Sequence, residues 1–430
     1  MMDLLSEILC VLSRLTIWRY RPKIVGVTGS VGKTSTKVAI GTVLGTNHRV
    51  RVSYANLNNH LGLPLAILGV WTPEEVKLVG RDTPAGTARV RKFFFWTKVI
   101  VIGVWNILFR ADGYPDVLVL EYGADRPGNI KSLLKIAKPT IGVVTAIGDV
   151  PVHVEFYESS ADVAREKSRL IDGLPASGFA VLGADDEVVL RLKDRTRASV
   201  MTFGFSSGVD VRVTRFENKM EDGKPVGISF KIEYAGSIVP VRVGGVFGRA
   251  HASAAAAAAA VGLIFGMNLV TISEALERYV PERSRMQLVS GIKHTLVLDD
   301  AYNASPLSMC AAIETLADLT ASRKVAVLGD MLELGKHTPE AHEAVGRQVA
   351  GVADILVAVG PRAKFIAEAA AKAGMKRSAI SAFDDADSAI NPVKELIKEG
   401  DLILVKGSHA MQMEKVVAEL REVPFGTAQV

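Results

Sequence analysis

The sequence contains very little cysteine. Among its 430 residues only Cys10 and Cys310 are cysteines, and no Cys-x-x-Cys pair or Cys/His cluster lies near either of them. This scarcity argues against a disulfide-stabilised scaffold and against a structural zinc site, and it is typical of a reducing cytoplasm. We therefore expect a cytoplasmic protein.

A large excess of charge of one sign is also absent. Lysine and arginine total 51 residues against 46 acidic residues, for a net charge of +5. A surplus this small, spread along the chain, gives no reason to expect nucleic-acid binding. The content of 49% hydrophobic and 23% charged residues excludes intrinsic disorder and collagen-like structure. The length suggests two or three domains of roughly 150 residues each.

Long uninterrupted hydrophobic runs are missing too. One candidate for membrane contact, residues 93–109 (FFFWTKVIVIGVWNILF), has 17 residues and includes Lys98 and Asn106. As a helix it would reach about 25 Å, short of the roughly 30 Å hydrocarbon core of a bilayer. Its basic flanks and its tryptophans suit a membrane interface and also suit a packing helix. Three interpretations stay open: a membrane span, a peripheral helix at the inner face of the membrane, and burial against the protein.

The start of the chain is apolar at helical spacing. Four charged residues interrupt this run, namely Asp3, Glu7, Arg14 and Arg19. Such charges, and the lack of a small-residue cleavage site, argue against a signal peptide. We expect an amphipathic helix within residues 1–22.

Apolar runs separated by helical patterns come next. They are continuous, as is typical of strands in a parallel sheet covered on both faces, and lie at residues 23–29, 115–123, 140–148 and 178–186. From about residue 200 to 246 apolar and polar residues alternate, which predicts antiparallel strands and hairpins. The seven alanines from Ala254 to Ala260 then lie in a predicted helix, where small side chains permit close packing.

A second α/β series begins after Glu282. Its strand-like runs, each followed by helical sequence, lie at residues 294–300, 324–330, 354–360 and 401–407. We therefore predict an α/β protein with a central P-loop ATPase domain and a Rossmann-like C-terminal α/β domain. The central domain would have a mostly parallel sheet with an antiparallel β insert, and an apolar insert at about residues 72–114. The predicted bounds are 23–283 for the central domain and 284–430 for the C-terminal domain.

Residues 28–35 (TGSVGKTS) have the chemistry of a phosphate-binding loop. Glycines let backbone N–H groups turn toward phosphate oxygens, and the following helix offers its N-terminus to negative charge. In such loops the lysine reaches the β- and γ-phosphates and the next hydroxyl ligates Mg²⁺. The strict pattern requires glycine where this chain has Val27, so the loop is a variant, and a glycine turn without a nucleotide is the alternative. The candidate ATP-binding residues are Thr28, Gly29, Ser30, Gly32, Lys33, Thr34 and Ser35.

Several long motifs share their order with a known family. They are TGSVGKTSTK (28–37), NLNNHLGLPLAIL (56–68), LEYGADRPGNI (120–130), LDDAYNASPLSM (298–309), VLGDMLELG (327–335) with His342, and LVKGSHAMQMEKVV (404–417). Together they resemble the Mur ligase superfamily of ATP-dependent amide ligases, over about residues 23 to 418. The C-terminal motifs are most similar to the member that joins D-alanyl-D-alanine to UDP-N-acetylmuramoyl-tripeptide.

The resemblance implies an activity and its substrates. A carboxylate of a muramoyl-peptide acceptor would attack the γ-phosphate of ATP, and D-alanyl-D-alanine or a similar amine would displace phosphate from the acyl phosphate. Positioning and charge neutralisation would account for most of the catalysis. We expect a monomer that binds no nucleic acid and uses ATP with two Mg²⁺ ions.

The resemblance also implies roles for single residues. Glu121, at the end of an apolar strand, would join Thr34 at the first Mg²⁺, and His153 would ligate the second together with a carbamylated Lys167. The residues alone leave other interpretations open: a strand-end carboxylate paired with a basic residue, a structural histidine, and a solvated helix lysine. Lys33, Lys167, His153 and Arg285 are the expected catalytic residues.

The C-terminal half would contribute to the ATP site as well. The resemblance places Arg285 near phosphate, Asp299 near the ribose and Asn303 in the same ligand-facing turn. Lys406 and Asp330 lie at strand ends that face the expected cleft, although an ordinary strand-end role is open for Lys406.

Three departures from the family pattern qualify the assignment. The phosphate loop begins by residue 28, which leaves room for one helix where the family has a UDP-binding domain. The segment GRAHASAAAAA (248–258) lacks the usual histidine–asparagine pair, so adenine contacts must differ. The apolar insert at 72–114 permits a lipid-linked acceptor. Two alternatives therefore stay open: a related ligase with another acceptor, such as a glutamate ligase or a lipid II-modifying enzyme, and a membrane-associated P-loop NTPase without ligase activity.

Overall fold

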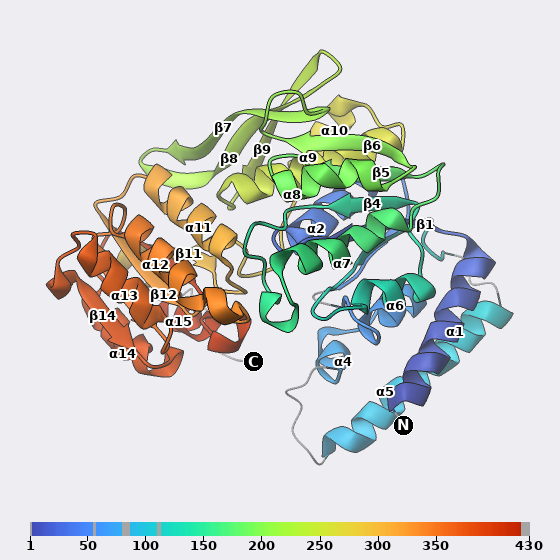
Figure 1. Cartoon of the computed structure of the whole chain (residues 1–430), viewed down its shortest axis with the longest axis horizontal. Helices are drawn as coiled ribbons and strands as arrows, with labels where there is room; N and C mark the ends of the chain where they lie inside the picture. The colour runs from blue at the N-terminus through green and yellow to red at the C-terminus, as the bar shows by residue number, and fades with distance from the viewer. Residues whose placement is uncertain (1, 55–56, 80–86, 110–112, 423–430) are drawn as a thin grey trace.

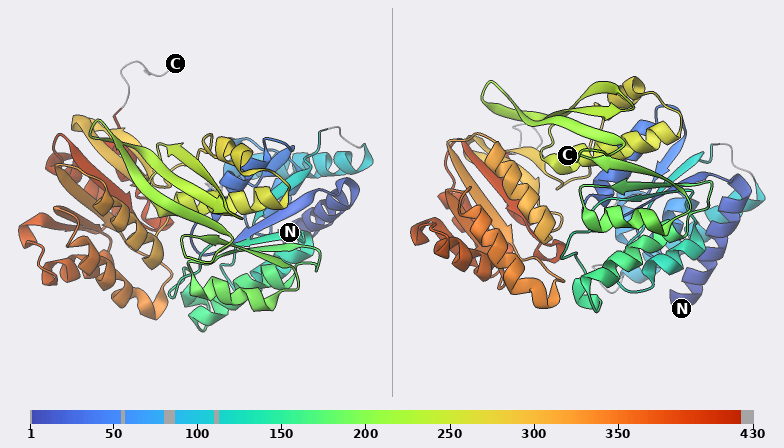
Figure 2. Two further views of the ribbon diagram at one scale, coloured as in Figure 1. Left: turned by 90° about the horizontal axis from the view of Figure 1, so that it is seen from above. Right: turned by 45° about the horizontal axis from the view of Figure 1, so that its top comes forward.

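The computed structural model describes residues 2–54, 57–79, 87–109 and 113–422. Two sheets organise this part of the chain, one in the first half and one in the second, with helices on both faces of each (Figure 1). Figure 2 shows the two sheets side by side, with the C-terminal one in orange and red.

The first sheet has nine strands in the order β2-β3-β1-β4-β5-β6-β7-β8-β9. Neighbouring strands are parallel from β2 to β7, and β7, β8 and β9 pair antiparallel. The bounds are β1 Lys23–Thr28, β2 Val50–Val52, β3 Val117–Glu121, β4 Ile141–Val144, β5 Phe179–Gly183, β6 Ser199–Gly204, β7 Val211–Glu221, β8 Lys224–Tyr234 and β9 Ser237–Gly244.

This arrangement confirms the mostly parallel sheet and refines one expectation. The predicted strands at 23–29, 115–123, 140–148 and 178–186 are β1, β3, β4 and β5. In the alternating region from 200 to 246, β6 pairs parallel with β5 and β7, so the predicted antiparallel pairing occurs only among β7, β8 and β9, at one edge of the same sheet. The alternation arises because one face of β7, β8 and β9 packs on the core while the other meets solvent.

Helices cover both faces of the first sheet. α2 (Lys33–Leu44), α9 (Arg249–Ile264) and α10 (Leu269–Leu276) share one large apolar core with the sheet. α6 (Asn129–Ile136) and α7 (Ser160–Asp172) pack on the opposite face, with the short α8 (Glu187–Leu190) beyond them. The predicted alanine-rich helix is α9, in which Ala254 to Ala260 are all buried and allow close packing of α2.

The second sheet has six strands in the order β10-β11-β15-β12-β13-β14. β10 is antiparallel to β11 and the other pairs are parallel. Alternate strand residues face two separate cores, one shared with α11, α12 and α13 and the other with α14 and α15. The bounds are β10 Gln287–Gly291, β11 Thr295–Asp300, β12 Arg323–Gly329, β13 Ile355–Val359, β14 Ile380–Phe383, β15 Asp401–Lys406, α11 Pro306–Asp318, α12 Thr338–Val349, α13 Ala363–Lys372, α14 Ala386–Leu396 and α15 Glu414–Leu420.

Six short 3₁₀ helices complete the described secondary structure. They are η1 Val154–Phe156, η2 Arg191–Arg195, η3 Ile292–His294, η4 Gly335–His337, η5 Arg377–Ala379 and η6 His409–Met411. η1 and η4 bring the two halves of the chain together, because Glu155 N–H donates to the Glu333 carbonyl at 3.3 Å.

The apolar segments at the start of the chain and at 93–109 form a helical layer beside the first sheet. α1 (Met2–Tyr20) and α5 (Thr87–Leu108) pack on α3 (Gly62–Leu68), with α4 (Pro73–Lys77) at their edge. Trp96 is half-buried against this cluster, whereas Trp105 is 58% exposed. Within the described residues, no helix has both the length and the apolar content that a membrane crossing requires.

Close packing around α9 generates a stability prediction. Ala256→Leu adds volume where no surface is exposed, and it should lower the free energy of unfolding by about 1–3 kcal/mol. Ala250→Leu on the exposed side of the same helix should change it by no more than about 0.5 kcal/mol. Urea denaturation followed by circular dichroism measures both, and equal effects of the two substitutions would contradict this packing.

Candidate active site

The predicted phosphate-binding loop, residues 28–35, lies between β1 and α2, as the sequence predicts. Gly29 has φ +148° and Gly32 has φ +84°, backbone angles that residues other than glycine rarely adopt. A Cβ at Gly29 would also lie only 2.0 Å from Thr145 Oγ1. Val27, at the position where the strict pattern has glycine, is buried inside β1. The chain therefore begins its turn at Gly29, after the strand.

The loop backbone is held by two lysines. Lys33 Nζ donates to the carbonyls of Gly29 at 2.9 Å and Ser30 at 3.3 Å. Lys167, on α7, is 1% exposed and donates from Nζ to the same Gly29 carbonyl at 3.0 Å. Burial lowers the pKa of Lys33, and burial together with the charge of Lys33 lowers the pKa of Lys167 to about 7. An amine with such a pKa is half neutral near physiological pH.

A buried carboxylate lies directly beside the loop. Glu121, the last residue of β3, is 2% exposed and pairs with Lys37 Nζ at 3.1 Å. It also accepts hydrogen bonds from the Thr34 hydroxyl at 3.2 Å and from Asn58 Nδ2 at 3.1 Å. Burial by itself would raise the pKa of Glu121, but Lys37 and Lys33 hold the pKa below its ordinary value. Glu121 is therefore ionised and presents oxygen atoms next to the Thr34 hydroxyl.

The C-terminal half reaches this cluster through Arg285. One guanidinium nitrogen donates to Thr34 Oγ1 at 3.1 Å, and the guanidinium lies 3.8 Å from the centre of the Tyr302 ring. Glu282, just upstream of Arg285, lies 3.5 Å from Lys37 Nζ. The segment around residue 284, at the boundary between the two halves, thus contacts the predicted phosphate-binding loop and the start of α2 from the side of the second sheet.

His251 supports Arg285 from behind. Its Nε2 donates to the Arg285 carbonyl at 2.8 Å, so its Nδ1 accepts from the Tyr279 hydroxyl at 3.1 Å. Burial lowers the pKa of His251, which keeps the ring neutral. The histidine in the altered segment 248–258 therefore positions the backbone at Arg285.

His153 lies at the junction of the two halves. It has φ +67°, its Nε2 lies 3.4 Å from Asp125 Oδ1, and its Nδ1 contacts a carboxylate oxygen of Glu333. Among the residues that the structure describes, no group of three or more His, Cys, Asp or Glu side chains is arranged to hold a metal ion. The two predicted ligands of a second metal thus have separate partners here, carboxylates for His153 and a loop carbonyl for Lys167.

The turn after β11 is braced by Lys406. This buried lysine at the end of β15 donates to Asp300 Oδ2 at 2.6 Å and to the Asn303 carbonyl at 2.8 Å. Asp299 accepts from the Ser284 hydroxyl at 3.0 Å, and burial raises its pKa. These contacts match the strand-end role that the sequence left open for Lys406, and they place Asp299 and Asn303 in one turn beside the segment of Arg285.

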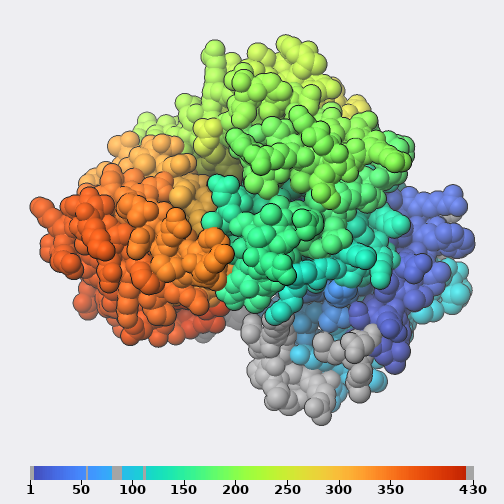
Figure 3. All heavy atoms as spheres, in the orientation of Figure 1, coloured from blue at the N-terminus to red at the C-terminus, as the bar shows by residue number. Residues whose placement is uncertain are grey.

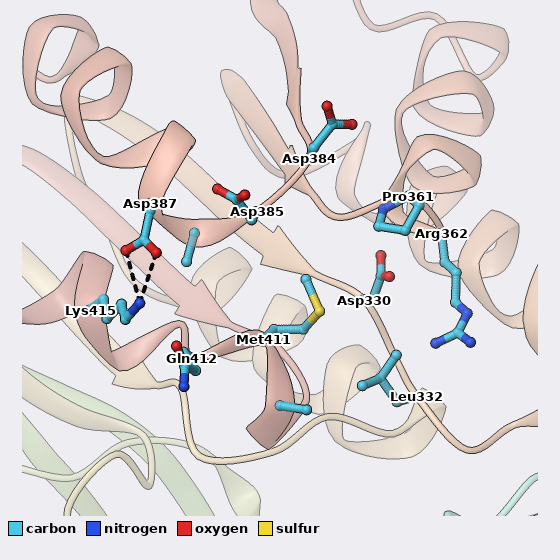
Figure 4. A pocket seen from close by; sticks show the side chains of 12 residues that line it. Asp330, Leu332, Pro361, Arg362, Asp384, Asp385, Asp387, Met411, Gln412 and Lys415 are labelled. Atoms are coloured by element: carbon cyan, nitrogen blue, oxygen red, sulfur yellow. Dashed lines mark hydrogen bonds and ion pairs between the residues drawn. The ribbon is translucent and has the colours of Figure 1, made fainter. Parts of the chain in front are cut away.

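A pocket of about 550 Å³ opens after β12, β13 and β14 (Figure 4). Asp330 lies in its wall and accepts from the Ala363 N–H at 2.6 Å. Both ring nitrogens of the nearby His342 are hydrogen-bonded: Nδ1 donates to the Thr338 carbonyl at 2.7 Å and Nε2 accepts from the Met331 N–H at 3.0 Å. The charged side chains that line the pocket are Asp330, Arg362, Asp384, Asp385, Asp387 and Lys415, of which Lys415 pairs with Asp387.

Sequence reasoning missed several members of this site. Lys37 lies one helical turn after Lys33 within a quoted motif, and Asn58 lies within another, so spacing could have indicated both. Glu333 also lies within a quoted motif, but its partner His153 is far away in the sequence, and Glu282 carries no local signal at all.

Comparisons with known proteins agree with this geometry. Residues 100–262 match the family described as Mur ligase middle domain, and residues 284–409 match Mur ligase, glutamate ligase domain. UDP-N-acetylmuramoyl-tripeptide–D-alanyl-D-alanine ligase of Bacillus subtilis is 30% identical, with 94% of this chain and 77% of the relative covered. The chain belongs to the Mur ligase family. As a member it is an ATP-dependent ligase.

Further relatives extend the comparison. The enzyme of the same name from Mycobacterium bovis is 31% identical, over 92% of this chain and 72% of that protein. Among solved structures, MurF ligase from Thermotoga maritima in complex with ADP has a TM-score of 0.76 and 25% identity, covering 96% of this chain and 83% of that one. The Mur ligase fold expected from the sequence is therefore confirmed.

The contacts of Glu121 generate a second stability prediction. Lys37→Met leaves a buried carboxylate without its ion-pair partner, so unfolding should become easier by about 3 kcal/mol. The double variant Lys37→Met/Glu121→Gln should recover most of that loss, because the unpaired charge is gone. The exposed pair Lys98–Glu75 provides the control, since Lys98→Met should cost no more than about 1 kcal/mol. Chemical denaturation measures the free energy of unfolding of all three variants. A loss of stability for Lys37→Met no larger than that for Lys98→Met would contradict the role of the Lys37–Glu121 pair.

Proposed function

We propose that the chain uses ATP to join D-alanyl-D-alanine to the free carboxylate of a UDP-N-acetylmuramoyl-tripeptide, a step of peptidoglycan precursor synthesis. The observation that carries this proposal is the loop between β1 and α2 with Glu121 on one side and Arg285 on the other. The substrates are those named by the relatives at 30–31% identity, whose alignments extend over at least 92% of this chain. We place the enzyme in the cytoplasm as a monomer.

Unpaired polar atoms in this loop region support ATP binding. Ser30 Oγ and Arg285 Nε are both buried and have no hydrogen-bond partner. Buried donors without partners are costly, so their presence favours a ligand that supplies acceptors, and phosphate oxygens are such acceptors. Thr34 and Glu121 would hold Mg²⁺, since a hydroxyl and a carboxylate are the oxygen ligands that this ion prefers.

The reaction we propose has two chemical steps. An oxygen of the acceptor carboxylate attacks the γ-phosphorus of ATP, which forms an acyl phosphate and releases ADP. The neutral amine of D-alanyl-D-alanine then attacks the acyl carbon, phosphate leaves, and the nitrogen loses a proton to give the amide. Lys33, Arg285 and the loop amides neutralise the charge that develops on the phosphoryl group. Bound Mg²⁺ adds to this neutralisation.

The pocket of Figure 4 is our candidate site for the amine substrate. It follows the carboxyl ends of parallel strands, where α/β folds bind ligands. Asp384 and Asp387 already pair with Lys364 and Lys415. Asp330 and Asp385 would therefore face the ammonium group of a dipeptide, and Arg362 its carboxylate. We assign residues 1–22 to an N-terminal amphipathic helix, 23–283 to the central ATP-binding domain and 284–430 to the C-terminal domain. Closure of the central and C-terminal domains on each other would bring both substrates together.

An assay of ADP release tests the proposed reaction. ADP should form only when ATP, the muramoyl-tripeptide and D-alanyl-D-alanine are all present. Lys33→Ala should reduce the rate to less than about a tenth, as expected for loss of a charge that stabilises the transition state, whereas Lys193→Ala at an exposed site should retain it. ADP release without acceptor and amine would favour the NTPase alternative, and release with glutamate in place of the dipeptide would favour a different ligase.

We further propose that Lys167 reacts with CO₂ to form a carbamate, which with His153 would serve a second Mg²⁺. Only the neutral amine reacts, and a pKa of about 7 means that protonation is lost as the pH rises through that value. At constant dissolved CO₂, carbon-13 NMR with labelled CO₂ should show a carbamate signal that grows between about pH 6 and pH 8.

Two variants of Lys167 make this test decisive. Lys167→Arg cannot form a carbamate, so it should lack the signal and most activity. Lys167→Ala should also be inactive, and acetate or formate should restore part of its activity by supplying the missing anion. Full activity of Lys167→Arg, or no signal in the wild type, would refute the carbamate.

A further inference from the structure

α1 and α5 each bury one face in the same apolar cluster. The inner face of α1 contributes Leu9 and Leu12, and that of α5 contributes Phe95 and Val99. α3 lies beneath both helices and completes the cluster. Because both helices pack on one cluster, their opposite faces both point away from it.

These opposite faces are apolar as well. On α1 the exposed apolar side chains recur every three or four residues, which places them on one stripe: Leu4, Ile8, Val11, Leu15 and Trp18. On α5 and the residue after it the exposed apolar side chains are Val90, Phe93, Phe94, Val101, Val104, Trp105, Leu108 and Phe109. More than half of the large apolar side chains that are exposed in the described structure lie on these two helices.

The two stripes form one surface. The helices lie side by side at the edge of the molecule remote from the second sheet (Figure 1). The Tyr20 hydroxyl donates to the Asn106 carbonyl at 2.8 Å, which joins the C-terminal ends of the two helices. A Cβ at Gly103 would come within 3.2 Å of Leu12, so this glycine permits their close approach. We name the outward side chains of both helices the α1–α5 face. The part of the chain that contains the two helices, in blue and cyan, lies at the right and lower right of Figure 3.

The charges around this surface are mainly positive. Among the described basic side chains of α5, Arg91 is exposed, Lys92 is half-buried and Lys98 pairs with Glu75 of α4, while α5 itself has neither aspartate nor glutamate. Arg14 and Arg19 are exposed on α1, where Glu7 is the exposed acidic residue of the described side chains. An apolar helix face with tryptophan, phenylalanine and basic residues fits the boundary between acyl chains and anionic headgroups.

We propose that the α1–α5 face docks on a lipid bilayer that contains anionic headgroups. Docking uses the outward stripes and leaves the inner faces packed on α3, so the fold stays intact. The basic residues contact headgroups, while the aromatic and aliphatic side chains enter the acyl boundary. This docking does not depend on the ligase reaction. It would hold Asn58, and the Glu121 carboxylate to which Asn58 donates, close to the membrane, because Leu57 belongs to the same cluster as α1 and α5.

Flotation of the full chain with vesicles tests the docking. The vesicles are phosphatidylcholine alone, or phosphatidylcholine with about a third of phosphatidylglycerol, at low and high salt. Wild type should float with the anionic vesicles, and high salt should weaken this binding. Phe94→Glu/Trp105→Glu should lower the partition coefficient for the vesicles at least about tenfold, which corresponds to about 1.4 kcal/mol.

A matched variant separates location from charge. Val270→Glu/Ile238→Glu introduces the same two charges at exposed apolar positions on α10 and β9, and it should float like wild type. Circular dichroism and ADP release should be unchanged for both double variants, which shows that they are folded. Failure of the wild type to float, equal flotation with both kinds of vesicle, or equal losses in the two variants would overturn the proposal. A dimer in light scattering that only Phe94→Glu/Trp105→Glu abolishes would also overturn it, because a second copy of the chain would then cover the face.

Discussion

The buried carboxylate of Glu121 connects the segments around the loop between β1 and α2, where we propose that ATP binds. It ends β3, pairs with Lys37 of α2, and accepts hydrogen bonds from Thr34 and Asn58. Lys37 also pairs with Glu282, and Thr34 also accepts from Arg285, so the boundary before the second sheet depends on the same group. Because a charge that is buried without partners is costly, these segments keep their relative positions only while the contacts are intact.

Small side chains make this arrangement possible. The loop can turn toward Thr145 because Gly29 and Gly32 have positive φ and no Cβ. α9 can lie close to α2 because its inner residues are alanines. Packing therefore fixes the helix that carries Lys33, Thr34 and Lys37, and the direction of these three side chains follows from it.

Much of this organisation could be predicted from the sequence, because its signals are local. Continuous apolar runs indicated β3, β4 and β5, and the spacing of glycines and Lys33 indicated the loop before α2. Contacts between distant segments could not be predicted in this way. Nothing near His251 shows that it would hold the Arg285 carbonyl, and nothing near Glu333 shows that it would pair with His153. Periodicity likewise identified apolar helices at the start of the chain and at 93–109, but only the packing on α3 distinguishes their inner faces from their outer ones.

The central claim is that this site activates a carboxylate with ATP. Its most direct test follows oxygen-18 from a labelled acceptor carboxylate during a single turnover with ATP and D-alanyl-D-alanine. If an acyl phosphate forms, the inorganic phosphate that is released keeps one labelled oxygen from the carboxylate, and mass spectrometry detects the heavier phosphate. If the phosphate carries no label while ADP is released, water has attacked ATP, and the account of a carboxylate-activating ligase is wrong.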